Sequence, residues 1–147
     1  MKILVSPKAE VLFARLNKPG ETSGEFDIVL KIDQSNPAHQ QLTEIIRKLI
    51  PEGGNSPIKE VNGETRVRFA SKQVPAIFNA NHNEIDSTQA RPGSTVEVAY
   101  KNYVYEGHSG GLKLLLEAVV VHDAAPKRTA EEFGFQKQLN PVEEVDF

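Results

Sequence analysis

The sequence contains no cysteine and no tryptophan among its 147 residues. The absence of cysteine excludes disulfide bonds, thiolate zinc sites and a cysteine nucleophile. No apolar run approaches the roughly 20 residues that a membrane-spanning helix needs. The longest run, residues 114–121, is interrupted by Glu117. The first ten residues hold too short an apolar patch for a secretory signal. We therefore expect a soluble, cytoplasmic protein with no membrane association.

Charge is unevenly distributed along the chain. The 20 acidic and 17 basic residues give a net charge of −3. Residues 122–147 contain six acidic and three basic residues, so the whole deficit lies there. Periodic strand and helix patterns also fade after residue 122, and the length suits one domain of ordinary size. We predict a single domain over residues 1–122, followed by a flexible acidic C-terminal tail over residues 123–147.

Most of the chain before the tail has strand character, with apolar and polar residues alternating between turn-forming residues. The predicted strands cover residues 11–16, 25–33, 58–61, 65–71, 76–79, 95–105 and 112–121. Asn62-Gly63 predicts a tight type I′ turn between two of them, because both turn positions require a positive φ.

One segment has helical periodicity. Asn36 is a favoured capping residue and Pro37 suits the first helical position. Four apolar residues then follow at helical spacing, and Pro51 ends the pattern, which predicts a helix of about fourteen residues. A lone helix between the second and third strand regions predicts an all-β fold with one helix, a five-stranded Greek-key barrel of the OB type. A β-sandwich is the alternative.

The sequence offers no catalytic or metal-binding pattern. The four histidines, His39, His82, His108 and His122, have no metal-ligand spacing, and we expect them to be surface residues. The glycine-rich segments lack the lysine and hydroxyl residue of a phosphate-binding loop. No nucleophile elbow is present, and nothing fixes a pair of carboxylates at catalytic distance. We expect neither enzymatic activity nor a metal or cofactor.

Basic and aromatic residues are interleaved on two predicted strands instead. Arg66 and Arg68 share one strand face, opposite Val67 and Phe69, and Lys72 follows them. Such a face can neutralise the phosphates of a nucleic acid. The alternative is an ordinary exposed strand face, which is often decorated with basic residues.

The second strand ends in a tyrosine-rich segment. If Tyr100 faces the interior, the pleat places Lys101, Tyr103 and Tyr105 together on the outer face. Residues two apart on a strand are separated by about 7 Å, which matches the stride of an extended nucleic-acid strand. Each ring could then stack on one base. Tyrosine is also simply a good strand former, and a β-bulge would reverse this assignment.

Two segments resemble single-stranded DNA-binding proteins of bacteriophages, of the podovirus replisome type. Residues 93–121 are similar to the closing hairpin of that family, with a Gly-Ser start, a Tyr-x-Tyr strand end, a glycine-rich turn and an apolar strand. The final residues, EEVDF, are similar to its acidic tail with a C-terminal phenylalanine. The segment GEFDIVLKID followed by a helix also fits the family's layout.

The resemblance implies an OB fold, sequence-tolerant binding of single-stranded DNA in phage replication and recombination, and no catalysis. It implies an acidic tail that competes with DNA for the groove and recruits a phage DNA polymerase or helicase in the infected bacterial cell. The implied groove residues are Arg66, Arg68, Lys72, Lys101, Tyr103 and Tyr105. The implied tail contacts are Glu143, Glu144, Asp146 and Phe147.

Several alternatives stay open at this point. The rival functions are a structural or scaffolding phage β-barrel protein that binds no nucleic acid, and a carbohydrate-binding or enzyme accessory module. The sequence does not distinguish DNA from RNA, because no residue can be assigned to reading a 2′-hydroxyl. It also leaves the oligomeric state open, with a homodimer among the options.

Overall fold

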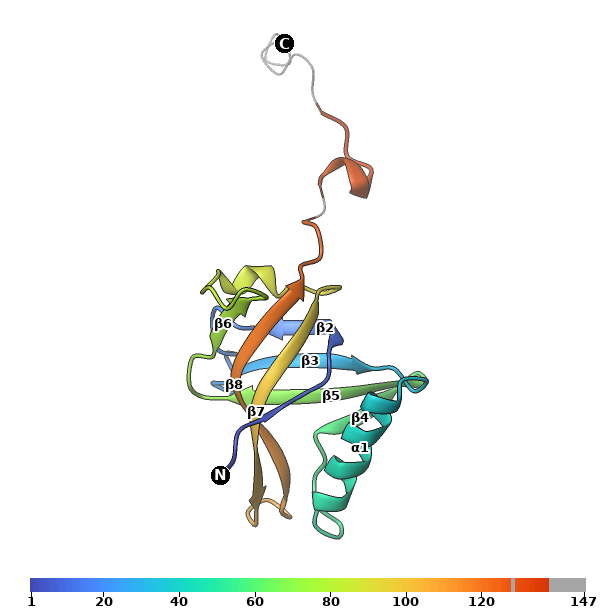
Figure 1. Cartoon of the computed structure of the whole chain (residues 1–147), viewed down its shortest axis with the longest axis vertical. Helices are drawn as coiled ribbons and strands as arrows, with labels where there is room; N and C mark the ends of the chain where they lie inside the picture. Colours follow the sequence, from blue (N-terminus) through green and yellow to red (C-terminus); the bar gives the residue numbers. More distant parts are fainter. Residues whose placement is uncertain (128, 138–147) are drawn as a thin grey trace.

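The computed structural model describes residues 1–127 and 129–137. They form a small β-barrel with one helix packed beside it (Figure 1). Five strands make the barrel, β2 (Ala9–Arg15), β3 (Phe26–Ile32), β5 (Glu64–Ser71), β7 (Thr95–Tyr105) and β8 (Gly111–Asp123). They pair in the order β7-β2-β3-β5-β8, and the pairing of β7 with β8 closes the ring. The contact between β5 and β8 is parallel and the other four are antiparallel. The prediction of a five-stranded OB-type barrel is confirmed.

Shorter elements extend this barrel. β1 (Leu4–Val5) pairs with β7, β4 (Ile58–Val61) pairs with β5, and β6 (Ala76–Asn79) pairs with β8. Two 3₁₀ turns, η1 (Ser87–Gln89) and η2 (Glu131–Phe133), lie in the connections after β6 and after β8. The sequence did not predict β1, because a two-residue strand is too short to show alternation. No helix within the described ranges is long and apolar enough to cross a membrane.

The helix α1 (Pro37–Leu49) lies between β3 and β4, as the sequence predicts. The Asn36 side chain accepts a hydrogen bond from the backbone N–H of Ala38 at 2.9 Å, which caps the first turn. Leu42 and Ile46 are buried, so the helix presents an apolar stripe to the rest of the fold. In Figure 1 the helix lies beside β4, at the lower end of the barrel.

His39, expected on the surface, is buried, so that prediction is wrong. Only 3% of its surface is exposed. Its Nδ1 accepts a hydrogen bond from the backbone N–H of Asp33 at 2.9 Å, and its Nε2 lies 2.8 Å from the carbonyl oxygen of Lys8. The first turn of the helix faces two loop segments, and the imidazole satisfies their backbone groups. A helical wheel does not reveal this role because both partners are backbone atoms of other segments.

The barrel interior follows the predicted alternation. Alternate residues of all five strands are fully buried: Val11, Ile28, Leu30, Val67, Phe69, Val96, Val98 and Val119. Tyr100 is also buried, with its ring centroid 5.1 Å from that of Phe69. Burial of this apolar surface is the main force that holds the barrel together. The outward face of each strand is therefore defined, and it is on this face that the site lies.

The β4–β5 hairpin turns through Asn62 and Gly63, with φ values of 53° and 79°. Both values are positive, as the predicted type I′ turn requires. This tight turn fixes the register of the hairpin, in which Lys59 lies opposite Arg66 and Val61 opposite Glu64. The turn thus fixes the positions of Lys59, Glu64 and Arg66 on the β4–β5 hairpin.

Candidate nucleic-acid interface

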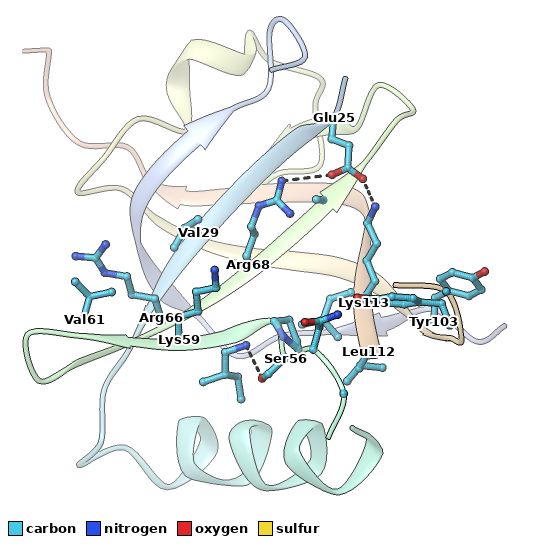
Figure 2. Close-up of a pocket in the computed structure, with 18 residues that line it drawn as sticks. Glu25, Val29, Ser56, Lys59, Val61, Arg66, Arg68, Tyr103, Leu112 and Lys113 are labelled. Atoms are coloured by element: carbon cyan, nitrogen blue, oxygen red, sulfur yellow. Dashed lines mark hydrogen bonds and ion pairs between the residues drawn. The ribbon is translucent and has the colours of Figure 1, made fainter. Parts of the chain in front are cut away.

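A groove of about 1030 Å³ runs across the outer face of the barrel. The β4–β5 hairpin lines one side, and the β7–β8 hairpin lines the other (Figure 2). Val29 of β3 and Ala70 of β5 also line it. The segment 54–57 borders it next to the helix (Figure 2). The groove is open to solvent and is lined by residues of several strands, so a chain that passes through it can contact both hairpins.

Three cationic side chains extend into the groove from the β4–β5 hairpin. Arg66 and Arg68 lie on the outer face of β5, while Val67 and Phe69 of the same strand are fully buried. Lys59 of β4 is the cross-strand partner of Arg66. Figure 2 shows these three side chains close together on one side of the groove. The prediction that the two arginines share an outer face is confirmed.

Tyr103 and Tyr105 form the opposite side of the groove. Their ring centroids are 6.2 Å apart, and the ring planes are inclined by only 24°. Tyr103 is 44% exposed, so one large aromatic surface faces solvent. Lys113 of β8 pairs with Tyr103 across the hairpin and also lines the groove. Two nearly parallel rings thus make an aromatic surface on this side of the groove.

A buried glutamate links the two sides. Glu25 forms an ion pair with Lys113 and a longer one with Arg68, whose Nη2 lies 3.5 Å from Glu25 Oε1. Figure 2 marks both interactions at one end of the groove. Glu25 is 8% exposed, so these contacts satisfy a carboxylate largely removed from water. Part of the positive charge that lines the groove is therefore already paired with the carboxylate of Glu25.

A second carboxylate, Asp27 of β3, lies next to the groove and pairs with Ala70 of its lining. The two carboxylate oxygens of Asp27 accept hydrogen bonds from Arg15 at 2.9 Å each, and Oδ2 also accepts one from Arg68 at 3.0 Å. Burial alone would raise the pKa of Asp27, but hydrogen bonds from Arg15 and Arg68 and their positive charges outweigh it and lower the pKa. Asp27 thus stays ionised and fixes both guanidinium groups in place.

The structure brings four of the six predicted binding residues together. Arg66, Arg68, Tyr103 and Tyr105 all line the groove. The predicted orientation of Tyr100, inward, and of the tyrosine pair, outward, is confirmed.

The other two lie outside the groove lining. Lys101 shares the outer face of β7, but its Nζ lies 3.2 Å from Glu117 Oε1. Lys72 is exposed in the segment that follows β5. The predicted tail contacts Glu143, Glu144, Asp146 and Phe147 fall outside the described residues.

Sequence reasoning missed Lys59 and Lys113. A signal for Lys59 was available, because the type I′ turn at Asn62-Gly63 places Lys59 opposite Arg66. Lys113 could not be found in this way, since the five-residue connection between β7 and β8 leaves their register open. Within residues 1–127 and 129–137, no three His, Asp or Glu side chains cluster closely enough to hold a metal ion.

Solved structures share the fold of this chain at low sequence identity. The gp2.5 protein of bacteriophage T7, a single-stranded DNA-binding protein, is 18% identical, with a TM-score of 0.72 over 95% of this chain and 96% of that chain. The single-stranded DNA-binding protein from bacteriophage Enc34, in complex with single-stranded DNA, is 14% identical, with a TM-score of 0.69 over 86% of this chain and 89% of that chain. A second structure of the Enc34 protein gives 16% identity and a TM-score of 0.68, over 87% and 85% of the two chains. Scans against protein-family models and curated protein sequences find no match.

Proposed function

We propose that this protein binds single-stranded DNA, with little dependence on sequence, in the groove between the β4–β5 and β7–β8 hairpins. The single observation that carries the proposal is the stacked pair Tyr103 and Tyr105 facing a row of arginine and lysine side chains. The proposal is supported by the fold that the chain shares with the phage proteins named above, which bind single-stranded DNA.

The tyrosine pair suits unpaired bases. Stacking of a base on an aromatic ring contributes roughly 1–3 kcal/mol, and it tolerates any base because every base has a π-face. Bases in a duplex are already stacked on each other and are not available to these rings. The pair therefore favours single strands over duplexes and does not select a sequence.

The cations suit the phosphates. Arg66, Arg68, Lys59 and Lys113 line the groove over three strands, so an extended backbone can pass several of them in turn. Arginine contributes a planar donor array that matches phosphate oxygens, and lysine a compact charge. Each phosphate contact releases counterions, so the affinity will fall as the salt concentration rises.

In this proposal the protein is not an enzyme. It covers single strands exposed during phage replication or recombination in the infected bacterial cell. The acidic C-terminal tail, with Glu143, Glu144, Asp146 and Phe147, competes with DNA for the cationic groove. A tethered peptide acts at a high effective concentration, so even a weak contact can occupy the groove until a longer polyanion displaces it. The same tail, with its terminal aromatic ring, offers replication partners such as a polymerase or helicase an apolar anchor beside negative charge.

A fluorescence-anisotropy titration with labelled poly-dT at two salt concentrations tests the proposal. We expect binding at low salt that weakens at high salt, and a loss of more than tenfold in affinity for the double variant Tyr103→Ala/Tyr105→Ala. The matched control is Tyr103→Phe/Tyr105→Phe, which keeps the rings and should keep most of the affinity. Absence of binding at low salt, or binding that does not depend on salt, would overturn the proposal.

A further inference from the structure

Phe13 is an exposed aromatic residue on the outer face of the barrel that does not line the groove. Phe13 of β2 is 43% exposed, whereas Val11, two residues earlier on the same strand, is completely buried. In a regular strand these two residues would point to the same side, into the barrel. The register explains the difference. Val11 pairs with Leu30 but Phe13 pairs with Val29, so an extra residue is inserted in β2 between them.

This β-bulge turns the Phe13 side chain out of the core. Bulges commonly redirect a side chain next to a functional site. An exposed phenylalanine forgoes the favourable free energy that burial in the barrel would supply. The direction in which the bulge turns Phe13 is therefore informative, and that direction is the face that carries the groove.

The pairing registers place Phe13 in line with the groove. Phe13 pairs with Val29 of β3, and Val29 pairs with Arg68 of β5. Val29 and Arg68 both line the groove. Neighbouring strands lie about 4.8 Å apart, so Phe13 lies one strand beyond Val29 and about 10 Å across the sheet from β5. A DNA strand that crosses β5 and β3 from the tyrosine pair reaches Phe13 next.

A positioned cation lies beside the ring. The guanidinium carbon of Arg15 is 5.1 Å from the centroid of Phe13. Both carboxylate oxygens of Asp27 hold this guanidinium at 2.9 Å, and the same carboxylate holds Arg68 of the groove. Gly20 packs against the guanidinium group of Arg15, because a Cβ at position 20 would lie 2.7 Å from Arg15 Nη1. The ring and the cation are thus held next to each other by contacts that also reach the groove.

We propose that Phe13, together with Arg15, is a further binding site for a nucleobase and its phosphate, which extends the groove across β3 to β2. This inference rests on the proposed binding of single-stranded DNA and deepens it. The phenyl ring has no hydrogen-bonding group, so it accepts any base, as the tyrosine pair does. Arg15 supplies the charge that a phosphate at the same position requires.

The absence of tryptophan makes a direct test possible. Phe13→Trp introduces the single tryptophan of the chain, and a base stacked on it should quench its fluorescence. The matched control is Val74→Trp, at a 74% exposed position that does not line the groove. With poly-dT we expect quenching of Phe13→Trp that saturates with the binding curve, and little change for Val74→Trp. Equal responses of the two variants, or none in either while the DNA binds, would overturn the assignment.

The affinity of a variant that lacks the Phe13 ring gives a second readout. Phe13→Ala should weaken binding of poly-dT by roughly fivefold or more, while Val74→Ala leaves it unchanged. Because Phe13 is exposed, its truncation should leave the thermal unfolding midpoint close to that of the original chain. If the original chain binds poly-dT and Phe13→Ala binds equally well, the Phe13 site is wrong and the groove stands. If the original chain does not bind at all, the proposed function itself is wrong.

Discussion

Asp27 of β3 holds the side chain of Arg68, which lines the groove. The Nε of Arg68 donates to Asp27 Oδ2 at 3.0 Å, and the carboxylate is nearly inaccessible to solvent. The same carboxylate receives two hydrogen bonds from Arg15, on the other side of β3. One buried anion of β3 thus orients two cations, one on each of the strands that flank β3. The arrangement fixes the charges of the outer face before any ligand arrives, so binding costs less side-chain entropy than it would with free arginines.

This carboxylate should make stability depend on acid pH. The pKa of Asp27 is lower in the folded chain than in the unfolded chain, so the unfolded chain takes up a proton first as the pH falls. The contribution of Asp27 is therefore complete at neutral pH and is lost progressively below about pH 4. Asp27→Asn should lower the free energy of unfolding at pH 7 by about 1.5–3 kcal/mol, because charge-assisted hydrogen bonds are lost. Urea unfolding at pH 7 and pH 3 measures both effects.

The control for this substitution is Asp123→Asn at the exposed end of β8. It should leave stability at pH 7 nearly unchanged. The difference in stability between the original chain and Asp27→Asn should also shrink at pH 3. A difference that is the same at both pH values would mean that the charge of Asp27 is not what stabilises the fold.

Glu25 should limit the affinity for DNA. Its carboxylate occupies Lys113 and Arg68, so a phosphate must compete with it for both cations. Glu25→Gln removes this competitor and should tighten binding of poly-dT severalfold, with a steeper dependence on salt. Glu97→Gln is the matched control, since Glu97 is a half-buried carboxylate of β7 paired with His122 outside the groove. It changes the net charge equally, and it should have a much smaller effect in the same anisotropy titration.

Lys59 and Lys113 should each contribute one phosphate contact. Replacing either by alanine should weaken binding uniformly across sequences. It should also reduce the slope of log affinity against log salt by about 0.7, the value for one phosphate on a single strand. Lys101→Ala, which removes a lysine paired with Glu117 outside the groove lining, should have a smaller effect on that slope. A larger effect for Lys101→Ala would indicate that the DNA passes along the other side of the β7–β8 hairpin.

Substitution of Gly111 should lower both the stability of the fold and the affinity for DNA, because Gly111 packs against Tyr105. A Cβ at this position would lie 2.7 Å from the carbonyl oxygen of Asn55 and 2.8 Å from Tyr105 Oη. Gly111→Ala must therefore move both neighbours, and overpacking of this kind typically costs about 1–3 kcal/mol. We expect a lower unfolding midpoint and also weaker DNA binding, because Tyr105 is displaced. Gly107→Ala, in the connection just before β8 and with no atom within 4 Å of its added Cβ, is the control.

Removal of residues 143–147 should tighten binding of poly-dT, since it removes the three acidic residues that we propose compete with DNA for the groove. The effect should be largest at low salt, where the attraction between the tail and the groove is least screened. A chain in which Glu143, Glu144 and Asp146 are replaced by their amides should behave like the truncated chain. Unchanged or weaker affinity in both variants would count against competition by the tail.

The sequence predicts most of the barrel because alternation and turn residues are local signals. The strands 58–61, 76–79 and 95–105 begin and end as predicted, and Asn62-Gly63 turns as its residue types require. Buried polar contacts between distant segments are not local signals. The burial of His39 and the pairing of Glu25 with Lys113 depend on which segments the fold brings together.

The candidate site is predicted only in part for the same reason. Arg66, Arg68, Tyr103 and Tyr105 follow from strand parity, which continues through each of their segments. Phe13 does not, because the bulge in β2 reverses its parity, and no residue type in that segment marks the inserted position. Lys113 needs the register of a long hairpin, which is set by packing rather than by its turn.

The closure of the barrel also constrains how the chain can fold as it is synthesised. Ala9 of β2 pairs with Val96 of β7, and Leu4 of β1 pairs with Tyr100. The strands β2, β3 and β5 are therefore synthesised before their partners, and their apolar side chains stay exposed until β7 and β8 complete the barrel. Contacts so distant along the chain form slowly, typically in milliseconds to seconds for small β-proteins. The groove, which is lined by β4 and β5 on one side and by β7 and β8 on the other, is complete only after this last step.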